Sequence, residues 1–448
     1  SSVCYFGLEY QGLYVTQSII SGGSDLHYLE VVIQADSIPV WGMCHRRLGN
    51  NVILYDKTGG TDCVRCFHLS VRSAHILEVH TEGLDKCYTN EAAALTTCPT
   101  QDDINNKRTR EVMLYKTLTI EGQPLEPAYC PIDGRFQFTF NKNDGTEGMT
   151  ECPEPTSSIS NCPAGNHLNL HFKRCTFGDF SKHLECLGSW EGSDGQRYLA
   201  LHDPEAELPQ PPGERSPPRF RCAMYKVEEG SGRVFLSFSS DSTCINNLHS
   251  AWEGYETLVL TPEPPTPPSH QISTSTCAFP AWSQGVWEHV RVEGNMLTYT
   301  DMKSYKTYRV FCLDNERNGI VPVYAQTQCG DEVFTCLALQ RRSNNVMEFQ
   351  MSPDSSDGYD PELCRAPQDR TWDRWLTQGR VDRFKQSPCP VAGEYTGRIP
   401  DAPVLCAKLY SDCNNPEIMF YTVYYCFNRT QVIEGKSLYS DCNNPEIM

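Results

Sequence analysis

The sequence predicts an all-β chain of tandem, disulfide-stapled antiparallel domains, small barrels or sandwiches, in an A-B-A-B arrangement of two domain types. Three observations predict this fold class. The 448 residues include 23 cysteines, short alternations of apolar and polar residues recur along the chain, and two cysteine patterns each occur twice. A chain of this length with such patterns favours several small domains over one large core.

The cysteine content indicates an oxidising compartment. A string of cytosolic zinc sites would need repeated ligand spacings, but the sequence has one tight pair, Cys63-Val-Arg-Cys66, and no second CxxC. No βαβ pattern surrounds this pair, as a redox motif would require. We therefore expect structural disulfides and an extracellular protein, secreted or the ectodomain of a membrane-anchored one.

The local pattern is that of β-strands almost everywhere. Phe136, Phe138 and Phe140 alternate with polar residues, so one face of the segment is apolar. Gly59-Gly60 and Gly330-Asp331 lie between strand-like runs, as hairpin turns do. Only residues 90–95 and 367–378 are reasonable helix candidates, and both are short.

The first domain type, type A, occurs twice. The segment CFHLSVRSAHILEV from Cys66 aligns without gaps on CLALQRRSNNVMEF from Cys336, and the opening at Cys4 aligns on the opening at Cys277. The matched type A cysteines are Cys4, Cys44, Cys63, Cys66 and Cys87 in the first copy and Cys277, Cys312, Cys329, Cys336 and Cys364 in the second. Five cysteines cannot all pair within a domain, and Cys98 could supply a sixth in the first copy.

The second type, type B, interleaves with the first. Its openings are Cys130-Pro-Ile-Asp-Gly134-Arg-Phe136 and Cys389-Pro-Val-Ala-Gly393-Glu-Tyr395. The type B cysteines that we expect in disulfides are Cys130, Cys152, Cys162, Cys175 and Cys186 in the first copy and Cys389, Cys406, Cys413 and Cys426 in the second. Equivalent cysteines should pair equivalently, within their own domains.

Domain boundaries follow from the repeats and from composition. We expect a type A domain at residues 1–125 (A1), a type B domain at 126–261 (B1), a linker rich in Pro, Ser and Thr at 262–276, a type A domain at 277–386 (A2) and an incomplete type B domain at 387–448 (B2). Residues 203–218 should form a long exposed loop inside B1.

Each domain opens with Gly-x-aromatic, and the four aromatics are Tyr14, Phe136, Trp287 and Tyr395. Glycine allows close backbone approach, and a ring two residues later points to the same side of the strand, where it can plug a barrel end. Lipocalin-like barrels open in a similar way, and larger barrels can enclose a ligand. A core aromatic that begins a β-sandwich is the alternative interpretation.

Charge and hydropathy exclude two classes of partner. A formal net charge of −18 repels phosphate backbones, so nucleic-acid binding is not expected. No apolar run reaches the roughly 18 residues that span a bilayer, so we expect no transmembrane segment within the chain. Ser1 is expected to follow a removed signal peptide, and Asn428-Arg-Thr is a glycosylation acceptor sequence.

Several segments together resemble a known family. TREVMLYKT, CPIDGRFQFTF, SSDSTC, GYETLVL, CAFPAWSQGVWEHV, WLTQGRVDR and CPVAGEYTG are similar to segments of cysteine-rich invertebrate proteins, chiefly from arthropods. The resemblance implies a secreted or single-pass membrane protein with tandem cysteine-rich domains. It implies no activity, ligand or catalytic residue.

The sequence contains none of the common catalytic motifs, HExxH, GxSxG, GxGxxG or a Walker loop. His167 and His171 are spaced as in a metal pair, but two surface histidines of one strand are favoured. We therefore expect a non-enzymatic protein without catalytic residues, metal or cofactor.

Two functions remain. The first is a structural or protein-interaction array of a matrix, coat or receptor ectodomain, whose partners are other extracellular proteins or copies of itself. The alternative is a carrier of a hydrophobic ligand, such as a lipid, in lipocalin-like barrels. Enclosed apolar cavities would favour the carrier, whereas filled cores and exposed aromatic residues would favour the array.

The carboxy-terminal segment departs from the type B pattern. Residues 439–448, YSDCNNPEIM, repeat residues 410–419 letter for letter, where B1 has Cys186-Leu-Gly-Ser-Trp190. A polar turn with Pro445 would replace a core strand there. We expect the native protein to carry a different sequence at residues 439–448, with Cys442 alone in its proper place.

Overall fold

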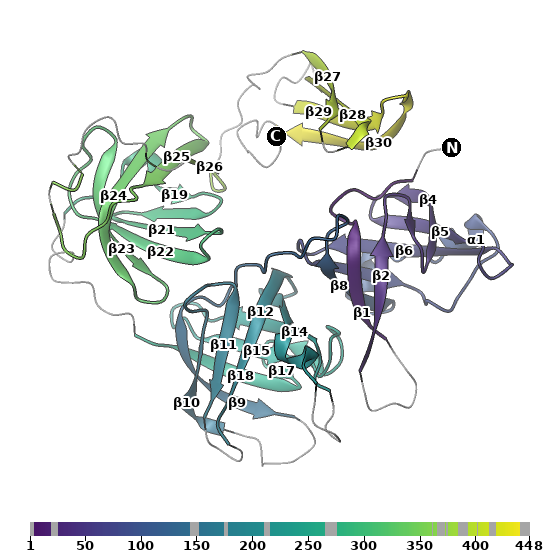
Figure 1. Ribbon diagram of the computed structural model, residues 1–448, viewed down its shortest axis with the longest axis horizontal. Helices are drawn as coiled ribbons and strands as arrows, with labels where there is room; N and C mark the ends of the chain where they lie inside the picture. Colours follow the sequence, from purple (N-terminus) through teal and green to yellow (C-terminus); the bar gives the residue numbers. More distant parts are fainter. Residues whose placement is uncertain are drawn as a thin grey trace. The chain divides into compact units, whose positions relative to one another are not determined.

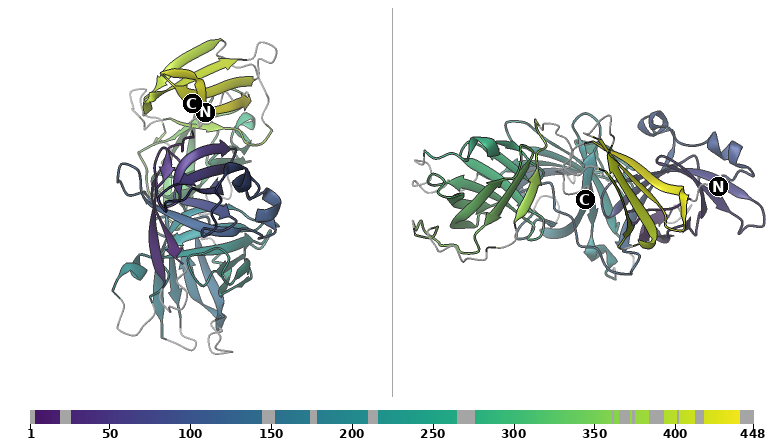
Figure 2. Two further views of the ribbon diagram at one scale, coloured as in Figure 1. Left: turned by 90° about the vertical axis from the view of Figure 1, so that its right-hand side faces the viewer. Right: turned by 90° about the horizontal axis from the view of Figure 1, so that it is seen from above.

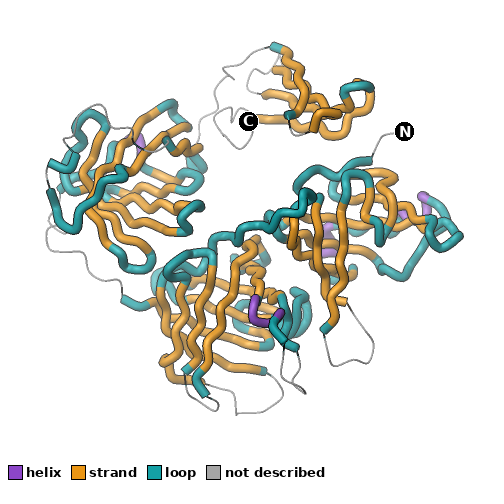
Figure 3. The backbone as a smooth tube through the Cα atoms, viewed as in Figure 1, coloured by secondary structure: helices purple, strands orange, loops and turns teal. Residues whose placement is uncertain are grey.

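The computed structural model describes residues 4–18, 26–143, 152–173, 178–209, 216–264, 276–360, 362–364, 372, 375–383, 393–400, 402–411 and 418–439. Strands dominate this part of the chain, and its helices are short (Figures 1 and 3). The chain divides into two compact units, Ser1–Glu263 and Pro264–Met448. The predicted all-β fold of tandem disulfide-stapled domains is confirmed.

A1 is an eight-stranded antiparallel sheet that curls around its own core, with strand order β2-β1-β8-β7-β6-β5-β4-β3. Its strands are β1 (Gly12–Ser18), β2 (His27–Ile33), β3 (Ser37–Ile38), β4 (Gly42–Leu48), β5 (Asn51–Asp56), β6 (Cys63–Val71), β7 (Ile76–Thr81) and β8 (Arg110–Leu118). Alternate residues of a strand share a face, so Phe67, Leu69 and Val79 point into one core.

B1 is a closed barrel with strand order β10-β11-β12-β13-β14-β15-β18-β9. Its strands are β9 (Arg135–Lys142), β10 (Cys152–Ser160), β11 (His167–Phe172), β12 (Phe180–Glu191), β13 (Arg197–His202), β14 (Phe220–Val227), β15 (Val234–Phe238) and β18 (Glu256–Pro262), and β16 (Leu248–Ser250) pairs with β17 (Glu253–Gly254) outside it. Phe138 and Phe140 both meet Phe172 edge to face, at 5.3 and 5.1 Å between ring centroids, and help to fill the barrel.

A2 repeats the strand succession of A1, with order β19 to β26 along the sheet. Its strands are β19 (Gly285–Val286), β20 (Val290–Glu293), β21 (Met296–Asp301), β22 (Lys306–Cys312), β23 (Ile320–Thr327), β24 (Glu332–Arg341), β25 (Val346–Met351) and β26 (Leu376–Gly379). A bridge between Trp287 and Arg380 brings the two ends of the sheet together. Figure 2 shows the curled sheets from two further sides.

Strand register supports the correspondence between A1 and A2. β5 and β6 pair Val52 with Phe67, and β23 and β24 pair Val321 with Leu337. Leu337 therefore occupies in A2 the place that Phe67 occupies in A1. The same register places Thr335 at the position of Arg65.

B2 is an antiparallel sheet of four strands within the described residues, in the order β27-β28-β29-β30. The strands are β27 (Glu394–Ile399), β28 (Ala402–Ser411), β29 (Ile418–Tyr425) and β30 (Asn428–Tyr439). Leu405, Val423 and Tyr424 are buried, while β27 is exposed along most of its length.

The described helices are single turns or little more. They are α1 (Glu91–Leu95), α2 (Gln101–Asn105), and the 3₁₀ turns η1 (Pro204–Glu207) and η2 (Ala281–Ser283). α1 lies where a helix was predicted, with the Asn90 side chain accepting from the backbone N–H of Ala93. A helix over 367–378 is wrong for its last residues, because Leu376–Gly379 pairs with β25; most of that segment lies outside the described residues.

Candidate functional site

The two type A barrels are plugged by the predicted aromatic residues. Tyr14 and Trp287 are 1% and 2% exposed. The Tyr14 hydroxyl donates to the carbonyl of Tyr10, and the Trp287 indole N–H donates to the carbonyl of Ser283, both at 2.8 Å and both four residues upstream. Gly12 begins β1 at φ +146°, and a Cβ there would lie 2.7 Å from the Leu118 carbonyl oxygen. Glycine is required at this opening because the backbone of β8 approaches so closely.

A cation covers each plug. The Lys116 ammonium lies 5.3 Å from the Tyr14 ring centroid, and the Arg380 guanidinium lies 4.3 Å from the Trp287 ring. Lys116 and Arg380 are the cross-strand partners of these two aromatics. The two domains therefore share a cation–π lid at the same place in the fold.

The type B openings differ from each other. Phe136 is buried in the B1 core, two residues after Gly134. Tyr395 is 51% exposed, so this ring does not plug a barrel in the way that the Gly-x-aromatic openings of the type A domains do. β27 lies at the edge of a small sheet, and nothing among the described residues of B2 closes a barrel over it.

Each of the eight disulfides described joins two cysteines of the same domain. The described pairs are Cys4–Cys44, Cys63–Cys87 and Cys66–Cys98 in A1, Cys130–Cys186 and Cys222–Cys244 in B1, Cys277–Cys312 and Cys336–Cys364 in A2, and Cys406–Cys426 in B2. Cys162 and Cys329 are disulfide-bonded as well. Cys175, Cys389 and Cys413 lie outside the described residues, and the Cys152 side chain is likewise not described.

The pairing corrects part of the cysteine alignment. Cys66 pairs with Cys98, whereas its counterpart Cys336 pairs with Cys364. Cys364 therefore corresponds to Cys98 and not, as the alignment proposed, to Cys87. The Cys222–Cys244 bridge was not predicted, because B2 offers no aligned counterpart from which to recognise it.

A1 and B1 pack against each other through the outer faces of their sheets. Ile76, Met113 and Tyr115 of A1 belong to one apolar cluster with Trp190 and Phe220 of B1. The rings of Tyr115 and Phe220 stack with their centroids 4.3 Å apart. β7 is consequently buried on both faces, since its inward residues fill A1 and its outward residues meet B1.

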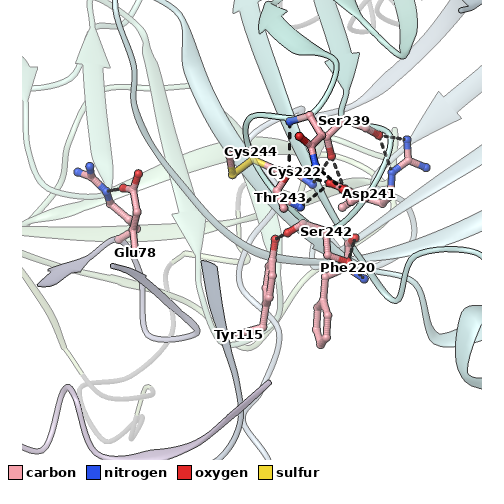
Figure 4. The surroundings of a disulfide bond; sticks show 12 residues. Glu78, Tyr115, Phe220, Cys222, Ser239, Asp241, Ser242, Thr243 and Cys244 are labelled. Atoms are coloured by element: carbon pink, nitrogen blue, oxygen red, sulfur yellow. Dashed lines mark hydrogen bonds and ion pairs between the residues drawn. A yellow bond between two sulfur atoms is a disulfide. The ribbon is translucent and has the colours of Figure 1, made fainter. Parts of the chain in front are cut away.

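Polar contacts lock the same interface around the loop that the Cys222–Cys244 disulfide ties down (Figure 4). The Tyr115 hydroxyl donates to the Ser242 carbonyl at 2.6 Å. The Gln17 side chain accepts from the Ser242 N–H at 2.8 Å and donates to the Asp241 carboxylate at 2.9 Å. This pattern holds the loop in one orientation against A1.

At a second place, where A1 closely approaches the backbone of B1, only glycine fits. Gly188 of β12 has φ +143°, and a Cβ there would lie 2.4 Å from the Ser73 Cβ. The Ser73 hydroxyl donates to the Leu187 carbonyl at 2.7 Å. The turn between β6 and β7 therefore reaches the B1 backbone directly, because residue 188 carries no side chain.

An acid–histidine cluster lies on the A1 side of this interface, and Figure 4 shows Glu78 there. Glu78 and His80 are outward residues of β7, and Glu111 of β8 is the cross-strand partner of His80. The Glu78 carboxylate forms an ion pair with the Arg72 guanidinium and a 3.0 Å hydrogen bond with His80 Nε2. His80 Nδ1 lies 3.2 Å from the Thr109 hydroxyl.

The pKa values of the two carboxyl groups of this cluster are shifted in opposite directions. Burial and the adjacent Glu78 charge raise the pKa of Glu111 from 4.5 to about 8. Burial also acts to raise the pKa of Glu78, but the hydrogen bond from His80 and the Arg72 charge outweigh it and lower the pKa to about 2. Glu111 Oε1 is buried without a hydrogen-bond donor among the described residues. A protonated Glu111 beside an ionised Glu78 balances the Arg72 charge.

Glu78, His80 and Glu111 offer donor atoms within 4.8 Å of one another, so they could also hold one metal ion. One imidazole and two carboxylates suit Zn²⁺. However, the Arg72 guanidinium already contacts Glu78, and a proton on Glu111 suffices to neutralise the group. Sequence reasoning missed this cluster, because polar residues alternating along a strand indicate a solvent-facing side.

A2 keeps only half of this arrangement. Arg342 and Glu348 form an ion pair equivalent to that of Arg72 and Glu78. Gln350 follows at the position of His80, and Trp375 aligns with Glu111 through the β25–β26 register. The complete acid–histidine cluster therefore lies in A1, whose β7–β8 face packs against B1.

A2 instead contains a cavity of about 650 Å³ at one end of its sheet. Apolar side chains of Tyr308, Val333, Met351 and Leu376 line it, and these residues pack against the A2 core from its open end. This size is typical of small-molecule sites. No sequence signal indicated it, since its walls come from six different strands, β21 to β26.

Of three further residues that the sequence singled out, His171 is exposed, whereas His167 and Asn428 are half-buried. The His167 ring stacks on His183 at 4.3 Å, and His171 Nδ1 lies 2.7 Å from the Ser181 hydroxyl, so the two histidines engage different partners. Asn428 begins β30 directly after the turn from β29. No helix in the described part of the chain is long and apolar enough to cross a membrane.

Domain-family models match the chain in four consecutive segments, each described as a domain of unknown function. Residues 2–103 match DUF7044, residues 126–262 match DUF7042, residues 273–377 match DUF7043 and residues 389–443 match DUF7045. No curated protein and no solved structure matches the chain. Four tandem domains of unknown function therefore cover most of the sequence.

Proposed function

We propose that this chain of four tandem domains is an extracellular, non-enzymatic array that presents rigid β domains to other extracellular proteins or to copies of itself. Disulfides in every domain support an oxidising compartment. The resemblance to cysteine-rich arthropod proteins, secreted or anchored by a single span, supports the same location. Glycosylation at Asn428 belongs to this proposal.

The main observation in support of the array function is the contact between A1 and B1. An apolar cluster, the Tyr115–Ser242 hydrogen bond and the buried Glu78 group make two barrels into one element. A flexible pair of domains would need no such buried polar contacts, because a buried polar group costs stability unless it is satisfied. Residues 1–263 thus act as a stiff double barrel.

The cores of the first two barrels argue against the carrier alternative there. Phenylalanines and aliphatic side chains fill B1, and Trp41, Phe67 and Leu84 fill A1. Exposed aromatic residues offer contact points for partners instead: Trp252 is 55% exposed on B1 and Phe427 is 79% exposed in the β29–β30 turn of B2. Aromatic side chains are favoured at protein interfaces.

Location and glycosylation can be tested on the native protein. Immunolocalisation and non-reducing peptide mapping should find it outside the cytosol with its disulfides formed, and Asn428→Gln should remove one glycan. A reduced, cytosolic protein would contradict the proposal. For the array itself, Trp252→Ala and Phe427→Ala should weaken self-association or partner binding, whereas Val227→Ala, at another exposed apolar residue, should not.

A further inference from the structure

The open end of A2 differs from that of A1 in what fills it. In A1, the Arg65 guanidinium donates to the carbonyls of Leu84 and Trp41, at 2.6 and 2.9 Å. The Trp41 ring stacks on Phe67 with 5.0 Å between centroids, and Leu84 packs against the same core. The chain itself thus closes this end of the first barrel.

A2 has smaller residues at the equivalent positions. Thr335 replaces Arg65 and Leu337 replaces Phe67, as the paired registers of β5–β6 and β23–β24 show. The Thr335 hydroxyl donates to the carbonyl oxygens of Ser352 and Asp354, at 3.2 and 2.8 Å, so it is satisfied without closing the barrel. The cavity of about 650 Å³ lies at this place, lined by Thr335 and its neighbours.

Apolar side chains that pack on the A2 core line one part of the cavity, and charged side chains of both signs, here called its rim, line another. Lys303 and Lys306 lie on or beside the β21–β22 turn, and Asp301 and Asp331 line the same rim. Asp301 accepts from the N–H of Lys303 and the hydroxyl of Ser304, and Asp331 accepts from the hydroxyl of Thr327. The turns thus occupy both carboxylates.

The two lysines differ from these two carboxylates in their contacts. Among the described residues, neither the Lys303 nor the Lys306 ammonium has an ion-pair or hydrogen-bond partner. Two lysine ammonium groups beside an apolar cavity suit a ligand with an anionic head group and an apolar chain. An ammonium and a carboxylate form a charge-assisted hydrogen bond.

We propose that the open end of the A2 barrel binds a single-chain amphipathic anion, with its apolar chain against Tyr308, Val333 and Met351 and its head group at Lys303 and Lys306. A1 cannot take such a ligand, because Arg65, Trp41 and Leu84 occupy the equivalent space. This binding role is independent of the array role, as it needs one domain and no protein partner.

The test uses the full chain and three twelve-carbon probes, dodecanoate, dodecanol and dodecyltrimethylammonium, with binding measured by calorimetry and native mass spectrometry. We expect one dodecanoate per chain. Lys303→Gln with Lys306→Gln should weaken dodecanoate binding by roughly tenfold or more and leave dodecanol unchanged, because only the anion uses the cations. Lys107→Gln, an exposed lysine of A1, is the matched charge control.

A second variant blocks the cavity itself. Met351→Trp should abolish binding of dodecanoate and dodecanol together, and circular dichroism shows whether it is folded. If it does not fold, Leu376→Phe serves the same purpose from the neighbouring strand. Absence of dodecanoate binding to the unmodified chain, or binding that neither the lysine nor the cavity variants change, would overturn the proposal. Failure here leaves the array role standing, and failure of partner binding leaves this site standing.

Discussion

The hydroxyl group of Tyr115, on the outer face of the first barrel, donates a 2.6 Å hydrogen bond to the carbonyl oxygen of Ser242, which lies in a loop of the second barrel 127 residues later. Burial raises the pKa of this phenol well above its usual value, so it remains a donor at every physiological pH. This bond and the stacking of the Tyr115 ring on Phe220 together fix the rotation of A1 relative to B1.

Tyr115→Phe should destabilise the double barrel by roughly 1–3 kcal/mol, since it leaves the buried Ser242 carbonyl without its donor. Urea unfolding of the full chain, followed by tryptophan fluorescence, measures this loss. Tyr359→Phe, at an exposed tyrosine of A2, is the matched control and should change little. Equal stability of both variants would show that the interface does not depend on this bond.

The acid–histidine cluster makes stability depend on pH in a defined direction. Glu111 has a raised pKa, about 8 in the folded chain against 4.5. The unfolded chain releases this proton near pH 4.5 while the folded chain keeps it, so the free energy of unfolding should fall as pH rises between about 4.5 and 8, by at most about 1.4 kcal/mol per pH unit.

Glu111→Gln mimics the protonated carboxyl and should remove that decline, so that the variant is more stable than the unmodified chain near pH 8. Chemical denaturation across this range measures the difference, with Glu191→Gln, an exposed carboxylate of B1, as control. Glu78 acts in the opposite sense: its lowered pKa contributes stability above pH 4.5 that is lost as pH falls towards 2. A steeper decline in Glu111→Gln would contradict the assignment of the proton.

The Trp287 and Tyr395 side chains should contribute unequally to the free energy of unfolding. Trp287→Ala should cost roughly 3–5 kcal/mol, because the ring is buried and its N–H is bonded to Ser283. Tyr395→Ala should cost less than about 1 kcal/mol, because that ring is half exposed. Thermal unfolding distinguishes the two, and similar losses would mean that Tyr395 is covered in the native protein.

Removing the Cys222–Cys244 bridge by a double change to alanine should cost roughly 2–4 kcal/mol. It should also free the loop that contacts Gln17 and Tyr115, so hydrogen exchange at Ser242 and at the outer strands of A1 should rise. The same change at Cys406 and Cys426 should accelerate exchange only in B2. Unchanged protection of A1 from hydrogen exchange after loss of the Cys222–Cys244 bridge would contradict this coupling between the disulfide and A1.

The terminal decapeptide remains a prediction, since residues 440–448 lie outside the described residues. Peptide sequencing of the native carboxy-terminal region should find a segment other than YSDCNNPEIM after Ser437 and Leu438. A spectrum that spans Gly435 into YSDCNNPEIM would show that the repeat is genuine.

The sequence alone determined the fold class and the main anchors of the barrels. Strand alternation is local, because inward and outward faces are set by residues two apart, so Phe136, Phe138 and Phe140 were recognisable as core residues. Gly-x-aromatic identified Tyr14 and Trp287 for the same reason. Cysteine counting indicated a disulfide framework, but connectivity depends on distance in space, and Cys364 was matched to the wrong partner of the first copy.

Only the tertiary structure decided where polar residues are buried and where the barrel is open. Glu78, His80 and Glu111 form a solvent-facing pattern along their strands, but Glu78 and His80 become buried and Glu111 half-buried where B1 packs against this face. The A2 cavity depends on side chains from several strands meeting at one end, where Thr335 and Leu337 stand in place of Arg65 and Phe67. Burial and cavities are properties of the closed, packed sheet, since no single strand encodes which other strands its side chains will face.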